Sequence, residues 1–174
     1  MNLATDHAGP TLRGALPWLS TLARLVLGTA WIVAGATKIT DLDASVRAVR
    51  AYRLLPETAA QIVGAGLPPA EILLGVLLVV GVGVRAGAVV SAVLMAAFVV
   101  GIVSAWARGL RIDCGCFGTG GELAVGEDPA YGWDLLRDAG LLALALALAR
   151  WPVGRFGIDG ALEARRARTT REDG

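Results

Sequence analysis

The chain has 174 residues, of which 55% are hydrophobic and 18% are charged, and its formal net charge is +1 at pH 7. Soluble domains average about 45–50% apolar and about 25% charged residues, so the composition is shifted toward that of membrane proteins. A net charge so close to zero offers nothing to a polyanionic partner, and we expect no nucleic-acid binding.

Four apolar segments reach the length of about 17–25 residues that a transmembrane helix needs. They cover residues 17–37, 58–84, 86–106 and 132–151. These segments predict an all-α fold class, namely an integral membrane four-helix bundle within residues 17–151, whose surroundings are membrane lipid.

The chain begins with a polar stretch, residues 1–16, which we interpret as a cytoplasmic N-terminal segment. The apolar run that follows is longer than the roughly 7–15 residues of a signal-peptide core, so we expect it to be retained as a span. Arg24 lies about seven residues into this first span, and Lys38 lies at its outer end.

The first connection, residues 38–57, has the pattern of a short helix. Val46, Val49 and Leu54 approximate the spacing of one helix face, with arginines between them. This pattern is typical of a short amphipathic helix at the membrane interface. Because proline disfavours a helical residue before it, we expect Pro56 to end that helix.

Glu71 lies near the middle of the second span, directly after Pro68-Pro69. Ionisable residues inside spans are costly and are therefore functional candidates. We expect Arg24 to reach Glu71, since the two residues lie at similar depths. Such a buried pair could hold the helices together, conduct protons to a redox site, or form part of a ligand pocket.

The third connection, residues 107–131, contains the only two cysteines of the chain, Cys114 and Cys116. Gly115 between them frees the backbone to bring the two sulfur atoms together, as a disulfide requires. Three interpretations remain open: a redox-active dithiol, an inert structural disulfide, or a metal site. Two thiolates fall short of four zinc ligands, and the single histidine, His7, lies at the far terminus, so we expect no metal.

Lys38 is expected at the same membrane face as the two cysteines. A nearby cation lowers the pKa of a thiol and so increases its thiolate fraction. The alternative is that the long side chain of Lys38 extends to the lipid headgroups.

The orientation follows from the arginine-rich tail, residues 152–174, which we expect to be a disordered cytoplasmic segment. With four spans, both termini are then cytoplasmic and the cysteine loop faces the oxidising side of the cell membrane. The arginines of residues 38–57 argue for the opposite orientation.

The loop Cys114-Gly-Cys-Phe-Gly118 and the stretch ARLVLGTAWIVAGATKI resemble the MauE/DoxX-type membrane proteins, in particular the methylamine-utilisation MauE branch. The resemblance covers nearly all of residues 17–150. The first-helix and second-helix positions that match the family pattern are Arg24, Gly28, Gly35, Lys38 and Glu71. At residues 137–138 the chain has Arg-Asp where the family pattern predicts Arg-Asn.

The resemblance implies a membrane protein linked to thiol redox chemistry or to the maturation of disulfide-containing exported proteins, methylamine dehydrogenase being the namesake case. We therefore predict a thiol-disulfide oxidoreductase that exchanges electrons with an extracytoplasmic thioredoxin-like partner. The catalytic residues are Cys114 and Cys116, and the supporting loop residues are Asp113, Gly115, Phe117 and Gly118. Quinone is a conceivable cofactor, although no motif demands it. The alternatives are a non-enzymatic assembly subunit and a small-solute carrier that uses the interior around Arg24 and Glu71.

Overall fold

The computed structural model describes residues 10–115, 120–124 and 126–152, with the backbone alone for residues 10–15. In this part of the chain the helices are α1 (Pro10–Ala36), α2 (Leu42–Ala51), α3 (Glu57–Val80), α4 (Val84–Ala107) and α5 (Tyr131–Arg150). Two short strands, β1 (Ile112–Asp113) and β2 (Gly121–Glu122), pair antiparallel. The mainly helical fold confirms the all-α part of the prediction, and the small β-ribbon in the third connection is an addition to it.

Three of the long helices are apolar enough to cross a membrane, over Leu16–Ala36, Glu57–Val80 and Val84–Ala107. α5 corresponds to the fourth predicted span and has 20 residues. It is less apolar than the others because it contains Asp134, Arg137, Asp138 and Arg150. Its membrane crossing therefore stays a prediction.

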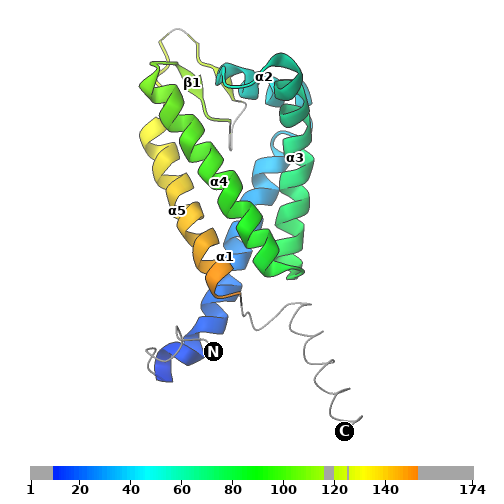
Figure 1. Ribbon diagram of the computed structural model, residues 1–174, viewed down its shortest axis with the longest axis vertical. Helices are drawn as coiled ribbons and strands as arrows, with labels where there is room; N and C mark the ends of the chain where they lie inside the picture. Colours follow the sequence, from blue (N-terminus) through cyan, green and yellow to red (C-terminus); the bar gives the residue numbers. More distant parts are fainter. Residues whose placement is uncertain (1–9, 116–119, 125, 153–174) are drawn as a thin grey trace.

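The four long helices associate in two pairs. α1 packs along α3 and α4 packs along α5, while α1–α5 and α3–α4 contacts join the pairs less extensively. Figure 1 shows that α1 begins and α5 ends at one end of the molecule, while α2, β1 and β2 lie at the other. We call the end that carries α2, β1 and β2 the loop end.

The core between the pairs is mainly apolar and includes a polar contact between α1 and α4. Leu27 and Trp31 of α1 pack with Leu78 of α3, and all three are almost completely buried. The Trp31 indole Nε1 donates a hydrogen bond of 2.9 Å to the Ser91 hydroxyl of α4. This bond satisfies two buried polar groups and fixes α1 against α4.

Glycines set the distance between α1 and α3. A Cβ atom on Gly75 would lie 2.5 Å from the carbonyl oxygen of Gly28, and a Cβ atom on Gly28 would lie 2.9 Å from the carbonyl oxygen of Gly75. Gly35 is equally close to α3, with the Pro68 carbonyl oxygen 2.6 Å from the position of a Cβ atom. Small residues of this kind allow membrane helices to pack closely, because packing rather than hydrophobicity holds such helices together.

We expect Gly75→Ala to destabilise the protein by about 1–3 kcal/mol, the usual cost of overpacking a tight contact. The matched control is Gly66→Ala in the same helix, where a new Cβ atom meets nothing within 4 Å. That change should be neutral or stabilising, since alanine is the better helix former. Thermal unfolding in detergent measures both, and equal effects would contradict the close α1–α3 contact.

The helix ends differ in detail from the predicted ones. α2 confirms the predicted helix in the first connection, and its first turn is capped by the Asp41 carboxylate, which accepts from the Ala44 N–H at 2.8 Å. Pro56 does not end α2, which stops at Ala51, and instead occupies the N-cap position of α3. α3 ends earlier than residue 84, because Gly81 adopts a left-handed conformation with φ 78°.

Candidate functional site

Cys114 directly follows β1 and is buried at the loop end, with 7% of its surface exposed. It packs in an apolar cluster with Ala51 of α2 and Ile102 of α4. The Tyr131 hydroxyl at the start of α5 supports the loop, because it accepts a hydrogen bond from the Ile112 N–H at 3.1 Å and donates one to the Leu110 carbonyl at 2.6 Å. The thiol is therefore held by three helices.

The loop around Cys114 is docked on α2. Gly115 and Gly120 have φ of 69° and 63°, a conformation that favours glycine. A Cβ atom on Gly120 would lie 2.4 Å from the Cβ atom of Ala48, and one on Gly115 would lie 3.1 Å from it. The Tyr52 hydroxyl adds a hydrogen bond of 2.9 Å to the Cys114 carbonyl. Both glycines are thus needed for contact with α2.

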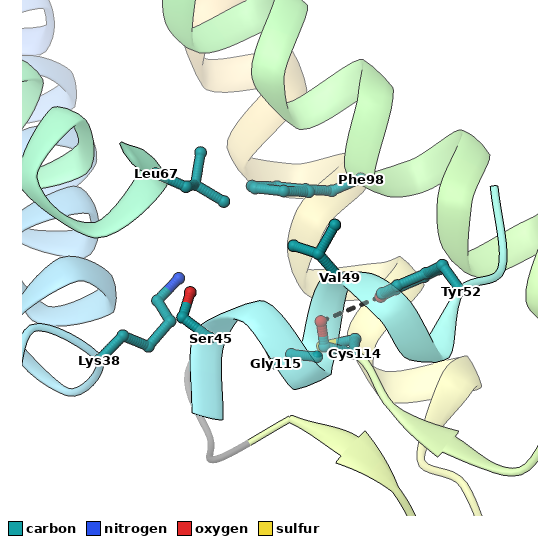
Figure 2. Close-up of a pocket in the computed structure, with 9 residues that line it drawn as sticks. Lys38, Ser45, Val49, Tyr52, Leu67, Phe98, Cys114 and Gly115 are labelled. Atoms are coloured by element: carbon teal, nitrogen blue, oxygen red, sulfur yellow. Dashed lines mark hydrogen bonds between the residues drawn. The ribbon is translucent and has the colours of Figure 1, made fainter. Parts of the chain in front are cut away.

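A cavity of about 40 Å³ lies between α2, α3, α4 and the loop. Figure 2 shows Lys38 and Ser45 on one side of it and Tyr52 with Cys114 on the other. Leu67 and Phe98 close it with apolar surface. Since a buried water needs roughly 10–15 Å³ of such volume, the cavity has room for a few water molecules beside the ammonium and hydroxyl groups.

A charged residue of α5 contacts the Cys114 thiol. The Arg137 Nη2 donates to Cys114 Sγ at 3.5 Å. Arg137 is in turn fixed by Asp134 at 3.1 Å and by Asp138 at 2.9 Å. We call Asp134, Arg137 and Asp138 the α5 charge cluster. Asp138 is completely buried and Asp134 is 7% exposed, so the cluster faces the interior of the protein.

The predicted partner of Glu71 was wrong. The two carboxylate oxygens of Glu71 lie 2.8 and 2.7 Å from the Lys38 Nζ, and both side chains are buried. The contacts of Gly28 with Gly75 and of Gly35 with Pro68 place Glu71 level with about residue 32, which is about 12 Å along α1 from Arg24. Within the described residues Glu71 is paired with Lys38 and not with Arg24, so the buried pair on which the carrier hypothesis depended is not the one observed.

The antiparallel register of α1 and α3 explains the correct pairing. Gly28 lies against Gly75 and Gly35 lies against Pro68, so Glu71 is level with about residue 32, one turn before the end of α1 at Ala36. Lys38 follows that end and turns inward, with 6% of its surface exposed. A lysine expected to support the thiol or to reach the headgroups is thus engaged with a buried carboxylate at the edge of the Cys114 cavity.

The structure brings some of the predicted site residues together. Cys114, Gly115 and Lys38 line one cavity, and Glu71 joins it through Lys38. Asp113 supports the loop, because its carboxylate accepts from the Gly115 N–H at 3.2 Å. The remaining predicted loop residues, which lie outside the described residues, are Cys116, Phe117 and Gly118. The dithiol therefore stays a prediction.

Sequence reasoning missed Asp134, Tyr52 and Ser45 and noted residues 137–138 only as an unusual pair. One signal was available, because three charged residues within the fourth span satisfy the same criterion that singled out Arg24 and Glu71.

Within the described ranges, no three histidine, cysteine or carboxylate side chains are placed to hold a metal ion.

Comparison with known proteins identifies the family. The family model described as "Methylamine utilisation protein MauE" matches residues 16–150. The chain belongs to the MauE family. The "Methylamine utilization protein MauE" of Paracoccus denitrificans is 33% identical over 135 residues, which cover 76% of this chain and 69% of the relative. No solved structure matches this MauE-family chain. The family match includes the Cys114 cavity and the α5 charge cluster.

Proposed function

We propose that α1, α3, α4 and α5 form a four-helix transmembrane bundle in the cell membrane. The distribution of side chains on α5 supports a fourth span, because Asp134 and Asp138 face inward while Leu136 and Leu146 are 66% and 56% exposed. A helix that directs its charges inward and its leucines outward suits a lipid environment. The other three long helices likewise expose large apolar side chains, among them Leu22, Leu73 and Val93.

The proposed orientation places the loop end outside the cytoplasm and both termini inside it. Several arginines at the loop end are matched by acidic partners, in the pairs Arg50–Glu57, Arg53–Glu122 and Arg111–Asp128. α5 ends at the opposite end of the molecule (Figure 1), and the arginine-rich tail follows it in the sequence. Positive residues close to the spans favour the cytoplasmic side, and the five arginines of the tail, together with Arg85 in the first turn of α4, support this orientation.

The function that we propose is thiol-disulfide exchange between the cysteine loop and an extracytoplasmic thioredoxin-like or disulfide-containing protein. In the balanced reaction, the Cys114 and Cys116 thiols and a partner disulfide give a Cys114–Cys116 disulfide and two partner thiols. Two electrons and two protons pass to the partner, and the reverse reaction oxidises it. MauE membership suggests that this exchange would serve an accessory role in methylamine utilisation.

The 3.5 Å contact between Arg137 Nη2 and Cys114 Sγ carries this proposal. A guanidinium beside a thiol stabilises the thiolate, which is the nucleophile in disulfide exchange. A purely structural disulfide has no need of a cation at its sulfur, and the partly buried charge of Arg137 would be costly there without its carboxylate partners. Support of this kind distinguishes a redox site from a cysteine that only fills space.

The proposal is tested by trapping the exchange intermediate in cells. Either single change, Cys114→Ser or Cys116→Ser, should accumulate a mixed disulfide with an extracytoplasmic protein, and a membrane-impermeant maleimide should label the loop of the reduced wild type in intact cells. The double Ser variant is the control and should keep the wild-type unfolding temperature. If no mixed disulfide is trapped and the double Ser variant keeps full activity, thiol-disulfide exchange is refuted. The non-enzymatic assembly role is then the function that remains.

A further inference from the structure

The Arg137 guanidinium directs each of its three nitrogen atoms at a different group. Nε donates to the Asp138 carboxylate at 2.9 Å, Nη1 lies 3.1 Å from the Asp134 carboxylate, and Nη2 donates to Cys114 Sγ at 3.5 Å. Because the guanidinium is planar and rigid, two fixed nitrogen atoms determine where the third one points. The two carboxylates therefore direct Nη2 toward the sulfur.

The contact with Asp138 is the one that turns the side chain of Arg137 inward. Successive residues of a helix point about 100° apart, so neighbouring side chains do not face each other unless one of them bends. The Asp138 side chain has no exposed surface, whereas that of Arg137 is 23% exposed and leaves α5 at the edge of its buried face. A long cationic side chain at such a position otherwise extends toward the membrane surface, where water solvates its charge. The bond from Nε to Asp138 opposes that alternative.

We infer that Asp138 is a positioning residue of the thiol site, which holds the Arg137 guanidinium in the orientation that brings Nη2 to Cys114. Arg137 touches the thiol itself, whereas Asp138 acts through Arg137. In this role Asp138 contributes a hydrogen-bond acceptor at Nε rather than a negative charge. The inference rests on the proposed thiol exchange, in which a guanidinium held at the sulfur favours the reactive thiolate.

The position and the charge of Asp138 have opposite effects on Cys114, so they can be separated. A carboxylate near a thiol disfavours the thiolate, and loss of the Asp138 charge alone would promote ionisation of the thiol. Loss of the Nε contact would release the guanidinium from the sulfur and suppress that ionisation. Asparagine removes the charge but keeps a carbonyl oxygen that can accept from Nε, whereas leucine, which is of similar size, removes both.

The test is the pH dependence of Cys114 alkylation by iodoacetamide in the full-length protein in detergent, with Cys116→Ser so that one thiol remains. We expect Asp138→Leu to raise the pH midpoint of the alkylation rate by about one unit. An adjacent opposite charge is worth about 1–3 units, and loss of the carboxylate charge offsets part of this. Asp138→Asn is the matched control and should not raise the midpoint. The midpoint is compared because greater exposure of Cys114 would increase the rate at every pH without moving the midpoint.

A second background removes the guanidinium that Asp138 is inferred to position. In Arg137→Met, Asp138→Leu should lower the midpoint instead of raising it, because only the loss of a negative charge remains. Asp138→Ala gives the same comparison if the leucine variant does not fold. The other titratable groups around the site are unchanged in all these proteins, and they are Asp113 of β1, Tyr52 of α2, Asp134 and Tyr131 of α5, and Lys38 with Glu71 across the cavity.

The outcomes separate this inference from the proposed function. A midpoint raised by leucine and not by asparagine, with the rise abolished in Arg137→Met, supports the positioning role. The inference is overturned if Asp138→Leu does not raise the midpoint, if asparagine raises it as much as leucine does, or if the rise persists in Arg137→Met. None of these results needs a partner protein, so failure to trap a mixed disulfide would refute the exchange reaction and leave the positioning role in place.

Discussion

Replacing Glu71 by Leu should destabilise the protein by about 3–5 kcal/mol, because it leaves the Lys38 ammonium buried without its carboxylate. Both oxygens of Glu71 contact Lys38 within 2.8 Å, and Glu71 has no exposed surface. Lys38→Met should cost a similar amount by stranding the carboxylate. The double variant, with two apolar side chains, should be much closer to the wild type than the sum of the two changes. Unfolding in detergent measures all three proteins.

The control for this cycle is Arg24→Met combined with Glu71→Leu. Arg24 lies about 12 Å along α1 from the level of Glu71, so the effects of these two changes should add. Additive losses for Lys38 and Glu71, or strong coupling of Arg24 to Glu71, would refute the register of α1 and α3 described here. The cycle therefore tests the backbone contacts at Gly28 and Gly75 as well as the ion pair.

The helices could be predicted from the sequence because each depends on local properties. Apolar length placed the long helices, and arginines spaced between apolar residues placed α2. The pairing of Glu71 could not be predicted in this way, since it depends on which turn of α1 lies against which turn of α3. That register is set by close approaches at glycines, such as Gly35 against the Pro68 carbonyl. The sequence-based prediction compared the depths of Arg24 and Glu71 by counting residues from assumed span ends, and it therefore chose the wrong partner for Glu71.

The candidate site was predicted in part for the same reason. The Cys-Gly-Cys pattern is local and drew attention to Cys114, and the positive φ of Gly115 agrees with the role given to that glycine. The α5 charge cluster lies some 20 residues later and reaches Cys114 only because α5 packs along α4. A pattern within one segment cannot predict a contact with a distant segment. Charged residues in an apolar helix nevertheless indicate that such a contact exists.

The docking of the loop on α2 leads to the second large effect that we expect. Gly120→Ala would place a Cβ atom 2.4 Å from the Ala48 Cβ and 2.9 Å from the Gly115 Cα, so the loop and α2 must separate. If overpacking costs the usual 1–3 kcal/mol, about 5- to 150-fold more molecules will have the loop undocked. Because Cys114 is buried under this contact, its alkylation rate in a Cys116→Ser protein should rise by a similar factor.

Gly126→Ala is the matched control for Gly120→Ala, because Gly126 lies in the same connection with φ 101° but a Cβ atom there would meet nothing within 4 Å. Backbone strain alone would accelerate alkylation in both variants, whereas loss of the α2 contact would accelerate it only in Gly120→Ala. An unchanged rate in Gly120→Ala would mean that α2 does not cover the thiol.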